Sequence, residues 1–239
     1  MPDASRNSAR GRPNRRRDPR VPMEEVLDAA LRLLDRDGLD QLTMRRLADE
    51  AGLGVMTLYG YVRTKDELLG LLGAHAFRDV DIPDGEALGW TEQLTTALHS
   101  LHGVFSRHPG IVDLLIAQVV TGPALNQVRN DLLGILIRAG FEVREAVEAF
   151  GSVVLYVFGF AIAERTRRRD AESPILDPPY GPLDQFPYLK VAAEQYPARV
   201  SLDAFNLGLG HLVAGLEAAL SGSGSAGESA GESAGESAE

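Results

Sequence analysis

The sequence predicts an all-α protein in which a small N-terminal domain of three short helices precedes a larger helical domain. Between residues 21 and 220, apolar side chains recur at the three- and four-residue spacing of a helix face. The two-residue alternation of β-strands is not convincing anywhere in this region. Near the N-terminus, a glycine-containing turn separates the second and third helical patterns, which is the spacing of a helix-turn-helix unit.

The two ends of the chain differ from this helical region in composition. Residues 1–20 are rich in Arg, Pro and Asn without periodicity, which predicts a flexible basic arm. Residues 221–239 read SGSGSAGESAGESAGESAE and offer no core-forming side chain, which predicts a disordered acidic tail. We therefore expect four parts, at residues 1–20, 21–78, 79–220 and 221–239.

Start and stop signals place the helices of the N-terminal domain. Pro22 suits the first turn of a helix and Gly38 ends it, whereas Thr43 caps a second helix that begins at Met44. Glycines then permit a tight turn before a short third helix over 55–62. Thr64, with a glutamate three residues later, forms a capping box that opens a fourth helix.

The larger domain reads as a second group of helices. We expect them at 90–107, 109–120, 123–139, 144–168, 188–195 and 201–220, with a proline-rich loop over 173–187. The longest uncharged apolar run, 149–163, is shorter than the roughly 20 residues of a membrane-spanning helix. We interpret it as a buried core helix, and we expect a cytoplasmic protein with no signal peptide and no membrane partner.

The composition argues against an enzyme. The chain has no cysteine, so it has neither a disulfide nor a thiolate nucleophile. It also lacks the phosphate-loop and HExxH motifs. His99 and His102 share a helix spacing, but two histidines without a nearby carboxylate are a weak metal signal. The sequence therefore predicts no catalytic residues, no cofactor and no metal site.

Charge is distributed unevenly along the chain, whose net charge is −10. Residues 1–78 carry 14 basic and 12 acidic side chains, whereas residues 79–239 carry 10 basic and 22 acidic ones. Seven arginines lie within residues 1–20. This polarity directs the N-terminal end toward phosphate groups, so nucleic acid stays a candidate partner despite the acidic total.

The segment 42–72, LTMRRLADEAGLGVMTLYGYVRTKDELLGLL, resembles the signature of the tetracycline-repressor (TetR) family. The matching positions are Thr43, Leu47-Ala48, Gly52, Thr57-Leu58-Tyr59, Lys65 and Leu68-Leu69. The second domain resembles the tetracycline-repressor subgroup at Trp90, His108-Pro109, Gly122-Pro123, Gly140-Phe141 and the stretch from Tyr156 to Gly159. The resemblance covers roughly residues 24–220.

This resemblance implies a double-stranded operator DNA partner and a set of contact residues. Arg45 resembles a side chain that reaches a base edge, and the third helix would be the recognition helix. The implied set is Thr43, Met44, Arg45, Val55, Met56, Thr57, Tyr59, Tyr61 and Lys65, with Arg15, Arg16 and Arg17 of the arm added as phosphate or minor-groove contacts.

Each of these positions also has a purely structural interpretation. Thr43 can act only as a helix cap, and Lys65 can be an ordinary solvated residue of a first turn. Tyr59 and Tyr61 are two positions apart on a helix, so at least one of them should be exposed. The arm can equally be a plain disordered tail. Val55 and Met56 are apolar, so they either meet a thymine methyl group or read nothing.

Two helices of the larger domain carry long apolar stripes. Over 201–220 the stripe steps by three and four residues like a coiled-coil seam, and the helix 144–168 is apolar on several sides. We expect these helices to form a homodimer interface as a four-helix bundle, as the family does; burial within one chain is the alternative. The expected interface residues are Val147, Val154, Phe158, Phe205, Leu209, Leu212 and Leu216.

The resemblance also implies a pocket for a small-molecule effector in the larger domain. Its candidate lining is mostly apolar with a few polar groups, and each residue can alternatively be plain core: His102, Phe105, Leu115, Gln118, Val119, Phe141, Phe150 and Tyr156. The tetracycline–magnesium pocket has a histidine shortly before the Gly-Pro step. Residues 111–121 contain none, which argues against tetracycline itself.

The function implied is a ligand-responsive transcriptional regulator, a repressor that a small molecule releases from its operator. Two alternatives stay open at this point, an architectural DNA-binding protein without ligand response and an activator. An enclosed apolar pocket would separate the first alternative from a ligand-responsive regulator.

Overall fold

The structure is a computed structural model that describes residues 21–83, 87–117, 122–169, 181–193 and 201–232, all-helical over these ranges apart from turns and loops. The N-terminal part, which we call the head, contains α1 (Met23–Asp37), the 3₁₀ turn η1 (Leu39–Gln41), α2 (Met44–Glu50), α3 (Val55–Leu58) and α4 (Lys65–Phe77). The body contains α5 (Trp90–Arg107), α6 (Pro109–Ile116), α7 (Pro123–Ala139), α8 (Val143–Arg169), α9 (Pro187–Ala192) and α10 (Leu202–Glu232).

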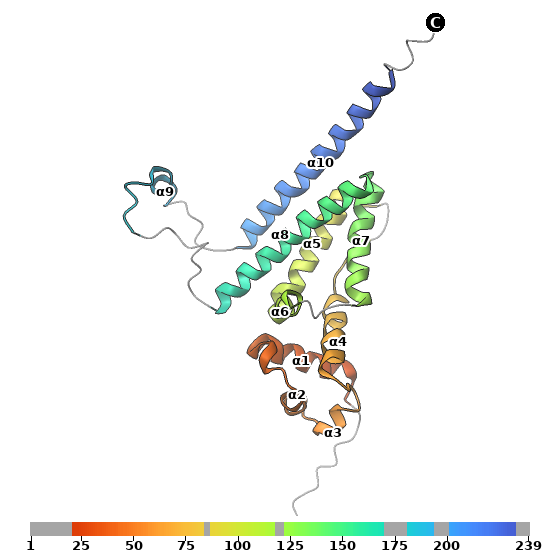
Figure 1. Cartoon of the computed structure of the whole chain (residues 1–239), viewed down its shortest axis with the longest axis vertical. Coiled ribbons are helices and arrows are strands. Elements are labelled where there is room, and N and C mark those ends of the chain that lie inside the picture. Colours follow the sequence, from red (N-terminus) through yellow and green to blue (C-terminus); the bar gives the residue numbers. More distant parts are fainter. Residues whose placement is uncertain (1–20, 84–86, 118–121, 170–180, 194–200, 233–239) are drawn as a thin grey trace, which may run out of the picture.

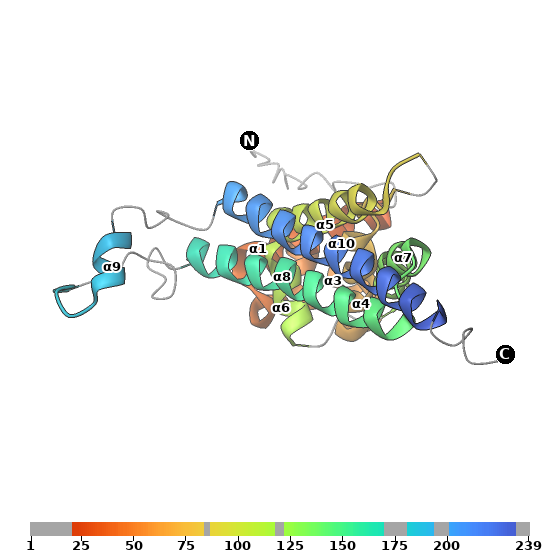
Figure 2. The same ribbon diagram turned by 90° about the horizontal axis from the view of Figure 1, so that it is seen from above.

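The head and the body lie at opposite ends of an elongated molecule, and α4 leads from one to the other (Figure 1). In the body, α8 and α10 run side by side across one face, as both views show (Figure 2). Helix α9 stands away from the rest of the body in both views. The fold therefore consists of the small head and the larger helical bundle of the body.

The expected start and stop signals act at the predicted places in the head. Gly38 ends α1 with φ +82°, a conformation that favours glycine, and its N–H donates to the Leu34 carbonyl at 2.9 Å. Thr43 caps α2 by accepting from the Arg46 N–H at 3.3 Å, and Thr64 caps α4 by accepting from the Glu67 N–H at 3.1 Å. Local chemistry thus fixes the ends of the head helices.

Several helix ends differ from those expected, and α6 ends at Ile116 rather than 120 and α9 at Ala192 rather than 195. Helix α3 ends at Leu58 rather than 62, because the next N–H groups, those of Gly60 and Tyr61, bond three residues back as in a turn. Helix α10 continues past residue 220 to Glu232, where we expected a disordered tail. An existing helix extends without a new nucleation cost, and the Ala and Glu of the repeat are good helix formers. The predicted arm 1–20 lies outside the described residues.

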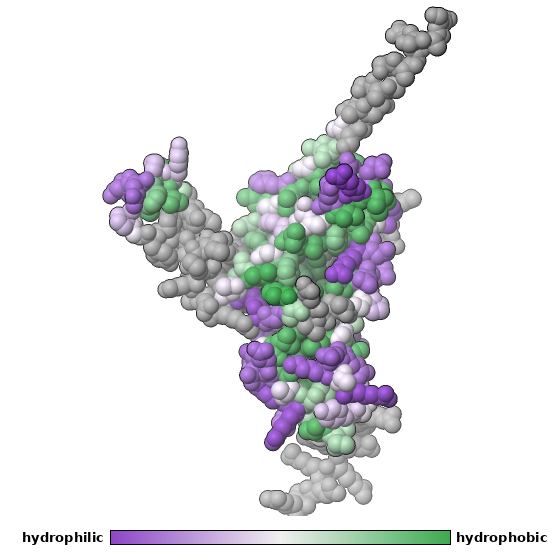
Figure 3. Space-filling model, viewed as in Figure 1, coloured by the Kyte–Doolittle hydropathy of each residue, from purple (hydrophilic) through white to green (hydrophobic). Residues whose placement is uncertain are grey.

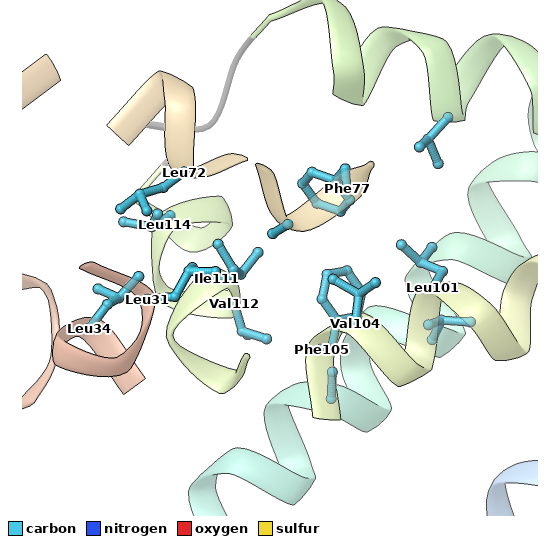
Figure 4. Packing of buried hydrophobic residues seen from close by; sticks show 14 of the residues in the cluster. Leu31, Leu34, Leu72, Phe77, Leu101, Val104, Phe105, Ile111, Val112 and Leu114 are labelled. Atoms are coloured by element: carbon cyan, nitrogen blue, oxygen red, sulfur yellow. The ribbon is translucent and has the colours of Figure 1, made fainter. Parts of the chain in front are cut away.

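One apolar core runs across the junction between head and body. Leu31 and Leu34 of α1 meet Leu72 of α4 and, from the body, Ile111 and Leu114 of α6 (Figure 4). All five side chains are buried. The expected boundary near residue 79 follows the end of α4, but apolar packing continues across it. A movement of α6, or of α4 at its body end, is therefore transmitted directly to the rest of the head.

Helix α8 is exceptional in its hydropathy. Within the described ranges, it alone is long and apolar enough to cross a membrane by length and composition, over Val143–Thr166. Only 28% of that window is buried in the chain, although the helix contacts α5, α6, α7 and α10. The expected buried core helix is therefore buried along one face only, and most of its residues are partly or fully exposed.

Gly110 is where α6 approaches α1 most closely, so Gly110→Ala should destabilise the fold. An added Cβ would lie 2.5 Å from Leu34 Cγ and 3.0 Å from the Leu34 carbonyl carbon. Overpacking of this kind costs about 1–3 kcal/mol, measurable as a lower urea midpoint. The matched control is Gly70→Ala in α4, where nothing lies within 4 Å of the new atom. That change should gain up to about 1 kcal/mol of helix propensity. Equal midpoints for the two variants would contradict the packing argument.

Candidate DNA-binding surface and ligand cavity

Helix α3 presents an outward face at the end of the molecule farthest from the C-terminal helix (Figure 1). Leu58 is fully buried and anchors it, while Met56 is 83% exposed. Val55, Thr57 and Tyr59 are exposed as well. Because successive residues of a helix turn by 100°, one inward leucine leaves the remaining side chains of this short helix facing solvent. The expected recognition helix therefore has the exposure that contact with a DNA groove needs.

Two neighbouring arginines of α2 have different surroundings. Arg46 holds the head together: its guanidinium binds Asp37 Oδ2 at 2.5 Å and Gln41 Oε1 at 3.1 Å. A hydrogen bond from Arg36 to the same aspartate lowers the pKa of Asp37, so this junction of α1 and α2 is ionised at neutral pH. Arg45 is exposed and makes no ion pair within the described part of the chain. Of the two, Arg45 has the guanidinium available to a ligand.

Thr43 is exposed, whereas three other predicted contacts in the head are less so. Met44 and Tyr61 are half-buried against the core, so Tyr59 is the exposed tyrosine of the pair. Lys65 is half-buried too, and its Nζ donates to the Leu39 carbonyl at 3.2 Å. Lys65 thus ties the start of α4 to η1. Arg15, Arg16 and Arg17 lie outside the described residues.

Arg63 was not singled out by the sequence, and the structure places it at the head surface. It is exposed immediately before α4, and its backbone N–H donates to Glu67 Oε2 at 2.8 Å. The expected capping box therefore differs in one partner, because the glutamate reaches Arg63 rather than the cap residue Thr64. The sequence signal that could have identified Arg63 is its position, as a basic residue between the recognition helix and the capped start of the next helix.

Polar contacts connect the head with the body through α6. Asp35 of α1 accepts from the Gly110 N–H at 2.8 Å, so it satisfies the beginning of α6, and its other oxygen lies 3.2 Å from His108 Nδ1. Asp113 of α6 in turn pairs with Arg165 of α8. These contacts link α8, α6 and α1 in series.

The body contains an apolar cavity of about 210 Å³. It lies among α4, α5, α6, α7 and α8. Its lining consists of Phe77, Leu101, Phe105, Leu115, Leu125, Val128, Arg129, Leu132, Phe150, Val154 and Phe158. Phe105, Leu115 and Phe150 were expected there. Phe77, Leu101 and the α7 residues were missed, and Val154 and Phe158 were expected at the dimer interface, because the sequence does not show which face of a buried helix meets a void.

Three other residues expected in the pocket lie elsewhere. Buried His102 stacks on Phe205 and its Nε2 is 3.2 Å from Glu164 Oε2. Phe141 packs edge-to-face against Trp90 at 5.5 Å. These side chains are apolar or amphipathic and suit a pocket by type, but inter-helix packing uses them instead.

Tyr156 is the third of these residues and joins α8 to α10. Its hydroxyl donates to the Phe205 carbonyl at 2.9 Å, and its ring packs close to Gly208. The remaining two expected pocket residues, Gln118 and Val119, lie outside the described residues.

The structure corrects the expected interface stripe in part. Phe205 and Leu209 are fully buried within their own chain, so they form the seam between α10 and the body rather than a contact surface. Val154 and Phe158 face the cavity. Leu212 and Leu216 are half-buried, and Val147 is the one expected interface residue that is well exposed. A seven-residue spacing identifies a stripe but not the chain that covers it.

A different apolar surface remains open on α8 and α10. Its large exposed side chains are Val143, Val147 and Leu155 of α8 and Leu202 and Leu207 of α10. Apolar side chains gather over this part of the body in the space-filling view (Figure 3). We call these five residues the bundle surface.

The outward α3, the capped α2 and the turn between them define a helix-turn-helix DNA-binding protein, here with a cavity in an attached helical body. Residues 26–72 match the family of bacterial regulatory proteins called the tetR family, and residues 82–220 match the tetracyclin repressor-like C-terminal domain. The chain belongs to the TetR family of transcriptional regulators, as its head signature and body landmarks predicted.

Individual relatives agree with this assignment. The transcriptional repressor DrrR1 of Streptomyces coeruleorubidus is 30% identical over 220 residues, which cover 88% of this chain and 80% of DrrR1. ActR of Streptomyces coelicolor in complex with actinorhodin is 29% identical with a TM-score of 0.67, covering 83% of this chain and 96% of ActR. BioQ with its double-stranded DNA operator is 25% identical with a TM-score of 0.55, covering 83% and 99%.

Tyr156→Phe should weaken the attachment of α10 to α8. Losing the hydrogen bond to the Phe205 carbonyl costs about 1 kcal/mol of unfolding free energy at neutral pH. Burial raises the pKa of Tyr156, so the native state favours the neutral phenol; its contribution is present at neutral pH and lost as pH rises above about 10. Urea unfolding of both proteins at pH 7.5 and at alkaline pH should therefore show a smaller alkaline loss in the variant. The control is Tyr59→Phe, which removes an exposed hydroxyl. If that variant changes the free energy of unfolding by more than about 0.5 kcal/mol, the loss in Tyr156→Phe cannot be assigned to its hydrogen bond with the Phe205 carbonyl.

Proposed function

We propose that this chain is a homodimeric repressor that leaves its operator when a small molecule occupies the cavity of the body. The observation that carries the proposal is the position of Phe77. This residue ends α4 and lines the cavity, while the other end of α4 follows the recognition helix α3. A molecule entering the cavity therefore touches the same helix that orients the DNA-reading surface.

The DNA contacts proposed for the head follow from exposure and chemistry. Arg45 supplies a guanidinium that can pair with a guanine edge, and Met56 with Val55 offers an apolar surface suited to a thymine methyl group. Thr57, Tyr59, Lys65 and Arg63 supply donors for phosphate oxygens. The complex of the related BioQ with its operator supports this use of the head.

The dimer is proposed from the bundle surface. Leu155 is 69% exposed and Leu207 64%, and large apolar side chains exposed together on one surface are typical of a protein–protein contact. A twofold dimer also supplies two heads, which read half-sites one helical turn apart, about 34–36 Å. We infer a cytoplasmic dimer in which α8 is covered by its partner subunit and not by lipid, without an enzymatic step.

Release from DNA requires a state of the dimer that the ligand favours and DNA does not. In the proposed mechanism, ligand contact with Phe77 moves α4, and the contacts of α6 with α1 carry the shift into the head. The separation of the two recognition helices then no longer matches one DNA turn. By linkage, DNA must weaken ligand binding by the same factor. The cavity favours this regulator over an architectural protein, and the repressor DrrR1 among the relatives favours repression over activation.

Arg45→Ala should reduce operator affinity about five- to 150-fold, because a bidentate contact with a base is worth about 1–3 kcal/mol. The measurement is fluorescence anisotropy with a labelled duplex from upstream of the chain's own coding region, beside unrelated DNA of equal length. The matched control is Arg138→Ala, an exposed arginine of α7 in the body, which should bind like the unaltered protein. Equal affinities for the two variants would exclude Arg45 as a base contact.

Leu155→Glu should separate the dimer, because it places a charge in the middle of an apolar interface. Sedimentation velocity at micromolar concentration should show a monomer for this variant and a dimer for the unaltered protein. Val55→Glu makes the same exchange on the head and should stay dimeric. A monomeric unaltered protein, or a dimer that persists in Leu155→Glu with native circular dichroism, would disprove the proposed interface.

A further inference from the structure

The cavity lining carries information about the chemistry of the molecule that it binds. Ten of its eleven lining residues are apolar, and four of these are phenylalanines contributed by α4, α5 and α8: Phe77, Phe105, Phe150 and Phe158. Figure 4 shows Phe77, Leu101 and Phe105 in the packed region where the head meets the body. Such a lining strongly disfavours a sugar, a peptide or another ligand rich in hydrogen-bonding groups, because few partners would satisfy them.

The phenylalanine rings are arranged for contact with another ring. Phe105 lies edge-to-face with Phe77 and with Phe158, at 6.2 Å between ring centroids in each pair. These three rings come from α4, α5 and α8, so aromatic side chains line the cavity from three different helices. Aromatic pairs in these geometries gain stabilisation beyond the area that they bury, so a flat aromatic ligand gains more here than an aliphatic chain.

Arg129 is the one charged residue of the lining. It is exposed on α7, and its Nη1 donates to the neutral amide oxygen of Asn126 at 3.3 Å. Within the described residues it has no carboxylate partner, and no acidic side chain belongs to the lining. A guanidinium at the edge of an apolar cavity, held only by a neutral amide, favours a ligand with a negative group beside its apolar part.

We propose that the cavity takes an aromatic acid, a fused-ring molecule whose rings lie among the four phenylalanines and whose anionic group meets Arg129. The proposal rests on the proposed function in one respect, that this cavity is the effector site. It goes beyond it by assigning the class of effector, and by making Arg129 the residue that separates acids from neutral molecules of the same shape.

The test uses two fluorescent probes of nearly identical shape, anilinonaphthalene sulfonate and its uncharged analogue N-phenyl-naphthylamine. Each is titrated into the unaltered full-length protein and into Arg129→Gln, which removes the charge from an exposed position without disturbing the core. The exposed Arg138→Gln of the same helix is the matched control. Leu125→Trp, at a half-buried position of the lining, narrows the cavity and tests whether either probe binds there.

We expect the sulfonate to bind more tightly than the neutral analogue. Arg129→Gln should raise the Kd of the sulfonate about three- to fivefold, as an exposed ion pair allows, and leave the Kd of the neutral probe unchanged. Arg138→Gln should change neither, and Leu125→Trp should weaken both at least tenfold.

Other results overturn the proposal. Equal loss for both probes in Arg129→Gln, no change for the sulfonate, no binding of either probe, or full binding in Leu125→Trp would each do so. DNA binding measured on the same samples keeps the two proposals apart. If the sulfonate binds in an Arg129-dependent way but saturating sulfonate does not lower DNA affinity, the aromatic-acid site is supported. The same result would contradict the proposal that this cavity controls DNA binding.

Discussion

The close approach of α6 to α1 is the constraint on which the rest of the molecule depends. Gly110 has no side chain, so Leu34 can fill the space where one would be, and the N–H of the same glycine reaches Asp35. This contact merges the head and the body into one apolar core. Without it, the head would be joined to the body mainly through α4, and the orientation of α3 would depend on a single helix.

Helix α8 serves two surfaces at once because neighbouring residues of a helix face different directions. Val154 and Phe158 face the cavity, whereas Leu155, directly after Val154, faces solvent on the bundle surface. In the proposed dimer, a ligand and a partner subunit would therefore contact adjacent sides of the same helix. Ligand affinity and dimer geometry are then properties of one structural element and cannot be adjusted independently.

The sequence was most informative where a local chemical rule decides the structure. Thr43, Thr64 and Gly38 mark helix ends, and each does so in the structure. The exposure of at least one of Tyr59 and Tyr61 follows from helix periodicity alone, and Tyr59 is the exposed one. These rules act over a few residues, so a single sequence contains all the information that they need.

Prediction was weaker wherever the answer depended on which helix lies opposite. Phe205 and Leu209 have the spacing of an intermolecular seam, yet α8 and α5 of the same chain cover them. Phe141 and Phe150 are alike in type, but only Phe150 faces a void. For Lys65 the sequence suggested a free ammonium, and the carbonyl that binds it belongs to a turn 26 residues away in the chain. Such pairings arise from three-dimensional packing, which residue spacing does not encode.

The bond between Lys65 and the Leu39 carbonyl has a consequence for the kinetics and selectivity of the head. A lysine side chain that becomes ordered only on binding loses about 2 kcal/mol of rotational entropy, whereas this one is ordered when the chain folds. Its ammonium has three N–H donors, and the carbonyl occupies one of them. In the proposed complex, the two remaining N–H donors meet a phosphate from a fixed position. The head is therefore a rigid surface that binds tightly when it is in the correct register on the duplex, and this lysine adds little to non-specific binding.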